Sequence, residues 1–177
     1  MKIKMSDEIE NKVAKSNLIT IELKDFHTPG DKVEIDIKKW LFNELVLKEK
    51  VFRDHLKDHD WTIYKGKFVA IHCSIDTIIP IWAFMLVTSY LQPFAEHIYF
   101  GNKIEMEKQL FQHKISLLDS KKFTNKKVLV KGCSDIFIPE NAYIEISNKL
   151  LKVVQSLMFG EACSLSLIHI SEPTRRS

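Results

Sequence analysis

The chain has 177 residues, of which 45% are hydrophobic and 28% are charged, and its formal net charge is +3. This balance is typical of a globular domain and argues against a disordered chain. The 26 basic residues are interleaved with 23 acidic ones, so no basic patch indicates nucleic-acid binding. The longest apolar stretch, Ile78–Leu91, is shorter than a membrane span. Because the start also lacks an apolar signal core, we expect a cytoplasmic protein.

Hydrophobic periodicity predicts an alternation of strands and helices. Apolar alternation and short apolar runs predict strands at Leu18–Leu23, Val33–Ile37, Phe68–Ile71, His97–Phe100 and Val128–Val130. Near-helical spacing predicts helices over residues 40–60, 80–94, 104–118 and 142–159. We therefore expect an α/β fold in three layers, with one mainly parallel sheet and helices on both faces. The two N-terminal strands are expected to be antiparallel at an edge.

The last residues are interpreted as foreign to the protein. The sequence from Leu165 to Ser177 reads LSLIHISEPTRRS, which resembles the translation of a sequencing adapter joined to a gene fragment. We therefore predict a single α/β domain over residues 1–164 and a non-native tail over residues 165–177 that replaces the native C-terminus. The alternative is a native, slightly basic tail.

A doubled motif gives the strongest functional signal. Each copy reads Cys-Ser, at most one spacer, then Asp-x-x-Ile-Pro-x-x-Ala-aromatic; the copies begin at Cys73 and Cys133. Each follows an apolar strand, and its proline suits the first turn of a helix. If the two copies are equivalent in structure, both cysteines end parallel strands and lie at the same edge of one sheet. Open α/β sheets bind their ligands at that edge.

These cysteines suit thiolate chemistry. A thiol near a helix N-terminus feels free amides and the positive end of the helix dipole, which favour the thiolate. A third Cys-Ser pair begins at Cys163. We predict a candidate site for an iron-sulfur cluster or zinc that is formed by Cys73, Cys133 and Cys163. The alternative is that Cys163, which follows the last predicted helix, lies at the opposite edge of the sheet and only Cys73 and Cys133 share the site. The residues available as further ligands are His72, Asp76, Asp135 and Glu161. The simpler interpretation is that the cysteines are packing groups, since cysteine is often buried.

Several segments resemble domain-of-unknown-function family 2480. The segments are Met5–Ile9, His59–Trp61, His72–Ser74, Ile79–Ala83, Gly132–Asp135 with Pro139 and Ala142–Tyr143, and Gly160–Ser164. The resemblance implies a member of an uncharacterised Bacteroidetes family that is often encoded beside the sulfur-mobilisation (SUF) machinery. It specifies no catalytic residues. Where relatives are expected to have proline, this chain has Ala162.

Three hypotheses follow. The preferred one is an accessory factor in iron-sulfur or sulfur metabolism that uses the cysteine site and binds the sulfur-mobilisation proteins. The second is a non-catalytic domain with structural cysteines that binds a partner or forms a homo-oligomer through exposed apolar surface. The third is a small-molecule enzyme with a thiolate nucleophile and His72 or Asp76 as acid or base. Adjacent strand residues point to opposite faces, which disfavours direct pairing of His72 with Cys73.

Overall fold

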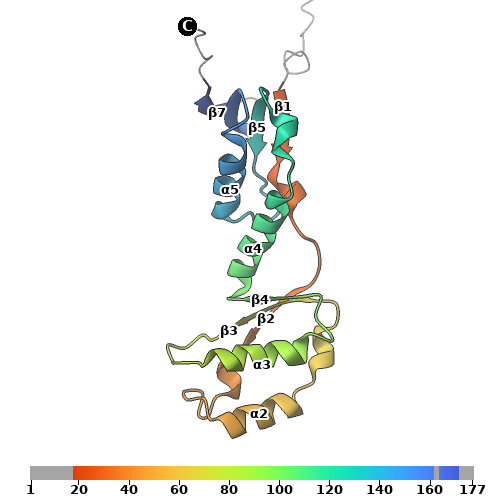
Figure 1. Cartoon of the computed structure of the whole chain (residues 1–177), viewed down its shortest axis with the longest axis vertical. Coiled ribbons are helices and arrows are strands. Elements are labelled where there is room, and N and C mark those ends of the chain that lie inside the picture. Colours follow the sequence, from red (N-terminus) through yellow and green to blue (C-terminus); the bar gives the residue numbers. More distant parts are fainter. Residues whose placement is uncertain (1–17, 162–163, 172–177) are drawn as a thin grey trace, which may run out of the picture. The chain divides into compact units, whose positions relative to one another are not determined.

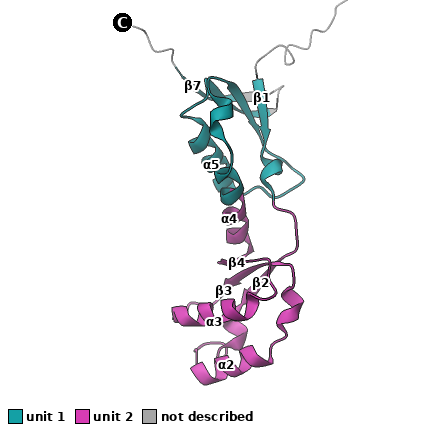
Figure 2. Ribbon diagram, turned by 45° about the vertical axis from the view of Figure 1, so that its right-hand side comes forward, with its two compact units in different colours: residues 1–27, 112–177 teal, residues 28–111 magenta. Residues whose placement is uncertain are grey.

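The chain forms an α/β structure with two sheets. The computed structural model describes residues 18–161 and 164–171 (Figure 1). Residues 28–111 form one compact unit, unit 2, and the described residues on either side of that range form unit 1 (Figure 2). Each unit has a sheet of its own.

Unit 2 contains a three-stranded parallel sheet with the strand order β2-β3-β4. Its strands are β2 (Lys32–Asp36), β3 (Phe68–His72) and β4 (His97–Phe100). Its helices are the 3-10 turns η2 (Ile37–Trp40) and η3 (Trp61–Tyr64) and the α-helices α2 (Glu49–Asp58) and α3 (Ile81–Leu91). The crossover from β3 through α3 to β4 is the connection that parallel neighbours require.

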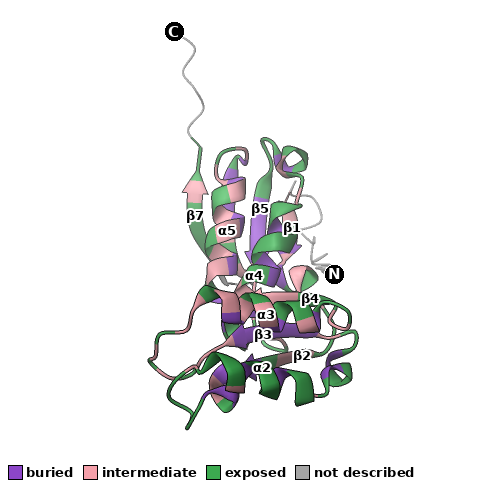
Figure 3. Ribbon diagram, turned by 60° about the horizontal axis from the view of Figure 1, so that its bottom comes forward, coloured by how far each residue is buried: buried purple, intermediate pink, exposed green. Residues whose placement is uncertain are grey.

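Helices cover both faces of this sheet. Val69 and Ile71 of β3 belong to a buried cluster with residues of α2 and α3, whereas Ala70 packs with Met106 and Leu110 of α4 (Lys103–Ser116). Successive strand residues alternate between faces, so a strand with every residue buried must be covered on both sides. β3 approaches this case (Figure 3), since it is buried from Phe68 to Ile71 and half-buried at His72.

Unit 1 contains a four-stranded sheet with the order β1-β5-β6-β7. Its strands are β1 (Leu18–Glu22), β5 (Lys127–Lys131), β6 (Ser156–Glu161) and β7 (Ser164–Ile170). The first three are parallel and β7 is antiparallel to β6. Its helices are η1 (Leu23–Phe26), the end of α4, η4 (Ser120–Phe123) and α5 (Glu140–Leu150).

The two units repeat the same structure with a spacing of 59 residues, the distance along the chain from Pro80 to Pro139. Pro80 precedes α3 and Pro139 precedes α5, each accepting a hydrogen bond at 2.9 Å from an alanine amide, Ala83 or Ala142. The strand register repeats with the same spacing. Phe68 lies opposite His97 in the β3–β4 pair, and 59 residues later Lys127 lies opposite Ser156 in the β5–β6 pair. The same spacing also relates Asp60, which caps η3, to Asp119, which caps η4. The doubled cysteine motif is therefore part of a longer internal repeat.

The α/β class and the mainly parallel strands are confirmed, but the prediction of one sheet is wrong. β1 pairs with β5 rather than with a strand of unit 2, and strand pairing between distant segments is not encoded in local periodicity. The N-terminal strands β1 and β2 do lie at sheet edges, but they are parallel to their neighbours.

The predicted helix over residues 142–159 is confirmed only as far as Leu150, and the rest of that prediction is wrong. α5 ends at Leu150 and the chain then forms β6. Leu157 fits the helical spacing of the preceding apolar residues, but Leu157 and Phe159 occupy the repeat positions of Ile98 and Phe100 in β4. A short turn after α5, with the Leu150 carbonyl accepting from Val153 N–H at 2.9 Å, ends the helix.

The C-terminal segment forms part of the described structure. Residues 165–170 lie in β7, which pairs with β6. The origin of residues 165–177 stays a prediction, as does the division at residue 164. Among the described helices, none combines the length and the apolar character needed to cross a membrane.

Candidate functional site

Cys73 lies in the turn between β3 and α3. It is half-buried and packs against the core cluster of unit 2. Asp36, at the end of β2, fixes this turn, because its Oδ1 accepts hydrogen bonds from Ser74 N–H at 3.1 Å and Lys38 N–H at 3.0 Å. Burial works against ionisation of Asp36, but a hydrogen bond from the Ser74 side chain, the two backbone hydrogen bonds and the nearby His72 together outweigh it and hold its pKa below the ordinary value. The turn is therefore braced from a neighbouring strand.

Cys133 lies in the equivalent turn between β5 and α5. Its Sγ accepts a hydrogen bond from Asp135 N–H at 3.4 Å. Burial raises the pKa of Tyr143, and the nearby Cys133 adds to that rise. Lys24 forms an ion pair with Glu22, and this pairing raises the pKa of Lys24. The nearby Cys133 adds to that rise. The Cys133 thiol thus has a backbone amide and a lysine in its surroundings.

The two cysteines do not end strands of one sheet. Each follows a central parallel strand and precedes a helix, as the doubled motif predicts. However, β3 belongs to the sheet of unit 2 and β5 to the sheet of unit 1. The expectation of a common sheet edge is therefore wrong, because the repeat produced two sheets instead of two strands of one sheet. Both cysteines are free thiols.

The structure does not assemble the predicted ligands into a metal site. Within residues 18–161 and 164–171, no three or more histidine, cysteine or acidic side chains are placed to hold a metal ion. Asp76 and Asp135 are exposed in their turns. His72 is half-buried on β3, on the opposite strand face from Cys73. Cys163 and the Glu161 side chain lie outside the described residues. The three-cysteine site stays a prediction.

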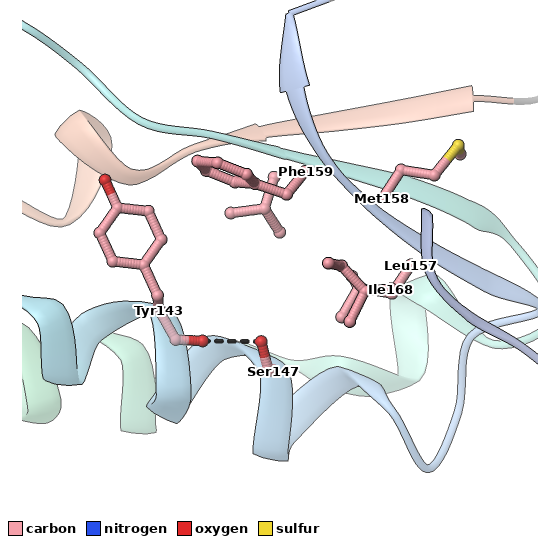
Figure 4. Close-up of a pocket in the computed structure, with 7 residues that line it drawn as sticks. Tyr143, Ser147, Leu157, Met158, Phe159 and Ile168 are labelled. Atoms are coloured by element: carbon pink, nitrogen blue, oxygen red, sulfur yellow. Dashed lines mark hydrogen bonds between the residues drawn. The ribbon is translucent and has the colours of Figure 1, made fainter. Parts of the chain in front are cut away.

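Each unit also has an apolar groove that the sequence did not lead us to expect. The groove lies between the helix of the repeat, α3 or α5, and the strand that follows it, β4 or β6. In unit 1 the groove lies between α5 and β6, and Ile168 of β7 closes one side (Figure 4). The rings of Tyr143 and Phe159 meet edge to face with their centroids 5.6 Å apart. The residues that line it are Val130, Tyr143, Ser147, Leu157, Met158, Phe159 and Ile168.

Unit 2 has the equivalent groove between α3 and β4, without a covering strand among the described residues. Its lining residues are Ile71, Phe84, Thr88, Ile98, Tyr99 and Phe100, and each of them lies 59 residues before a lining residue of the unit 1 groove. The rings of Phe84 and Phe100 meet edge to face at 5.2 Å. A second hollow continues over the outer face of α3, where Ile81 and Met85 also line the surface.

This surface of unit 2 is strongly apolar and accessible. Ile81 is 72% exposed, Met85 is 67% exposed and Phe100 is 69% exposed. The hollow over α3 is lined by Ile81, Phe84, Met85, Thr88, Ser89, Gln92 and Phe100, none of which is charged. We call Ile81, Phe84, Met85 and Phe100 the α3/β4 patch. Contiguous exposed apolar side chains of this kind mark interaction sites in soluble proteins.

The sequence did carry a signal for this patch. The segment Ile81–Leu91 contains no charged residue and only two hydroxyl-bearing residues before its tyrosine, Thr88 and Ser89. Only one face of such a helix can pack on a sheet, so apolar residues must remain on the other faces. Ala83, Val87 and Leu91 fill the inner face and are fully buried.

Comparison with known proteins identifies one family. A family model described as "Protein of unknown function (DUF2480)" matches residues 7–169. This range extends into the segment that we interpret as foreign. No curated protein and no solved structure matches the chain.

Proposed function

The chain belongs to the DUF2480 family, and we propose that it is a non-catalytic protein-binding domain that uses the α3/β4 patch of unit 2. The observation that carries this proposal is the exposure of Ile81, Met85 and Phe100 side by side around an uncharged hollow. Burial of one such side chain is worth about 1.5–3 kcal/mol, so leaving several exposed is costly unless a partner covers them.

The repeat strengthens this proposal by showing what a covered groove looks like. In unit 1, β7 lies against β6 and Ile168 closes the groove. Phe159, the counterpart of Phe100, is accordingly only 40% exposed. The same local fold thus occurs once with a cover and once without, and the uncovered copy presents the binding surface.

Site-specific photo-cross-linking tests the proposal. A photoreactive amino acid replaces Met85 in one variant and Ile144, its repeat counterpart on α5, in the control; the two native side chains are 67% and 62% exposed. We expect a cross-linked product from position 85 that mass spectrometry identifies as one defined protein and that Phe100→Lys abolishes. Equal cross-linking from positions 85 and 144, or none from position 85, would contradict the proposal.

A second candidate is a role in sulfur or iron-sulfur metabolism with the sulfur-mobilisation proteins as partners. The observation that favours it is the Asp135 N–H bond to Cys133 Sγ at 3.4 Å, with Lys24 nearby. In this version Cys133 acts singly: its thiolate attacks the outer sulfur of a donor persulfide, the donor thiolate leaves, and Cys133 holds the transferred sulfur. Zinc or a cluster would require ligands beyond one thiol.

Intact-mass analysis tests this candidate. After incubation with a low-molecular-weight persulfide, the chain should gain the mass of one sulfur atom at Cys133, and Cys133→Ser should abolish the gain. Cys73→Ser serves as the control, because Cys73 packs against the core of unit 2. Equal labelling of both cysteines, or no labelling, would leave packing as the role of these thiols.

A further inference from the structure

The edge of β4 is open among the described strands. β4 pairs with β3 on one side, and no other described strand pairs with it. Gly101 N–H donates to the Ile71 carbonyl at 2.9 Å. Because N–H directions alternate along a strand, the N–H groups of Ile98 and Phe100 point away from β3. One carbonyl near this edge is already engaged, since Gln109 Nε2 donates to the Phe100 carbonyl at 3.0 Å.

β4 lacks the side chains that usually protect an exposed edge. Edge strands are kept from pairing with another chain by a lysine, a proline, a bulge or a very short length. β4 consists of His97, Ile98, Tyr99 and Phe100, so its short length is the one such feature that it has. In unit 1 the corresponding edge of β6 is occupied by the antiparallel strand β7, with Phe159 opposite Ser166. The β6 edge therefore accepts an antiparallel strand, and this is the geometry that we expect at the β4 edge.

We infer that the α3/β4 patch binds a second copy of this chain, and that β4 pairs antiparallel with β4 of that copy. This inference rests on the proposed function and names its partner. A two-fold axis through the paired strands makes the interface self-complementary. It joins two three-stranded sheets and places α3 of both copies on the same side, so Phe100 and Met85 of one copy lie near those of the other.

Charge complementarity favours a second copy over an unrelated apolar strand. Glu96 precedes β4 and Lys103 follows it, and both are exposed. Antiparallel pairing brings the start of one β4 beside the end of the other. Glu96 of each copy therefore lies near Lys103 of its partner, and these opposite charges favour this orientation. Parallel pairing would instead set like charges beside each other.

Analytical ultracentrifugation of the full chain under reducing conditions tests the inference. We expect a reversible monomer–dimer equilibrium, and Met85→Lys and Phe100→Lys should each weaken it about tenfold or more. Ile144→Lys is the matched control and should leave it unchanged. Circular dichroism checks that each variant folds. Amide hydrogen exchange should show protection of Ile98 and Phe100 that is lost on dilution.

The outcomes separate the inference from the proposed function. A wild-type chain that stays monomeric over the whole concentration range overturns the second copy as partner, as does a dimer that Phe100→Lys does not affect. If position 85 then cross-links to a different protein, the binding function stands and only the partner is wrong. A cross-link to another segment of the same chain likewise overturns the inference. A dimer lost in both patch variants but kept in Ile144→Lys supports it.

Discussion

The Asp36 carboxylate accepts a hydrogen bond from Ser74 N–H at 3.1 Å and so joins the end of β2 to the turn that follows β3. The same oxygen accepts from Lys38 N–H and begins η2. One side chain therefore holds two turns at the carboxyl edge of the unit 2 sheet, and Cys73 lies in one of them.

Asp36→Ala should loosen this edge. Hydrogen bonds to a charged group contribute about 1.5–3 kcal/mol, and partial exposure of Asp36 places the expected loss of unfolding free energy at the lower end. Chemical denaturation measures this loss, and the rate of Cys73 alkylation should rise because its turn is freed. Alkylation of Cys133, in the other unit, serves as the internal control. An unchanged Cys73 rate would show that the turn holds its shape without Asp36.

His59 should make stability depend on pH. Burial lowers its pKa below 6.5, and the positive charge of Lys39 lowers it further. The unfolded chain therefore binds a proton at His59 more readily than the folded chain does, so stability is present above pH 6.5 and decreases as the pH falls toward the folded pKa. His59→Gln should flatten this dependence between pH 7 and pH 5, as measured by urea denaturation. A His59→Gln curve parallel to that of the wild type would contradict this assignment.

The ion pair between Lys32 and Glu107 joins β2 to α4 within unit 2. Its Nζ–Oε1 distance is 2.8 Å, and the side chains are 6% and 12% exposed. Removing one partner of a buried pair costs about 3–5 kcal/mol, so Glu107→Leu should strongly destabilise unit 2. The double variant Lys32→Met, Glu107→Leu should recover much of the loss in thermal unfolding.

An exposed ion pair provides the control for that experiment. Arg53 Nε lies 2.9 Å from Glu49 Oε1, but the two side chains are 45% and 62% exposed. Glu49→Gln should change the unfolding free energy by less than about 1 kcal/mol. Similar effects of Glu49→Gln and Glu107→Leu would show that burial of the Lys32–Glu107 pair is unimportant.

The repeat also predicts which glycines can be replaced. Gly66 has φ +69° with open space around it, and its counterpart Asn125 has φ 56°. Asparagine tolerates this left-handed conformation, so Gly66→Asn should be nearly neutral. Gly101 has φ +115°, and a Cβ there would meet Glu105, so Gly101→Ala should cost about 1–3 kcal/mol. Thermal unfolding compares the two variants; equal losses would refute the equivalence of Gly66 and Asn125.

Local sequence patterns predicted the parts that depend on local chemistry. The runs at Phe68–Ile71 and Val128–Val130 are buried strands, and the prolines at 80 and 139 directly precede helices. Strand pairing was not predictable in the same way, because β1 pairs with β5 more than a hundred residues later. The predicted cysteine cluster required β3 and β5 to lie in one sheet, and they lie in two.

Extending the doubled motif along the chain would have improved the prediction. The 59-residue spacing aligns Leu157 and Phe159 with Ile98 and Phe100, which predicts a strand at the end of unit 1 rather than a longer helix. It does not predict the exposed patch, because exposure depends on whether another segment covers the groove. The uncharged segment Ile81–Leu91 indicates that apolar residues remain on the outer face of α3, but only the tertiary structure shows whether another segment covers them.

Hydroxyl-radical footprinting of Met85 inside cells tests the central claim most directly, since it reports cover of the α3/β4 patch by any protein. We expect Met85 to oxidise more slowly in the wild-type chain than in Phe100→Lys, whose patch cannot be covered. Ile144→Lys should leave the Met85 rate at the wild-type value. Equal Met85 oxidation in wild type and Phe100→Lys would show that the patch is uncovered in the cell and would contradict the binding function.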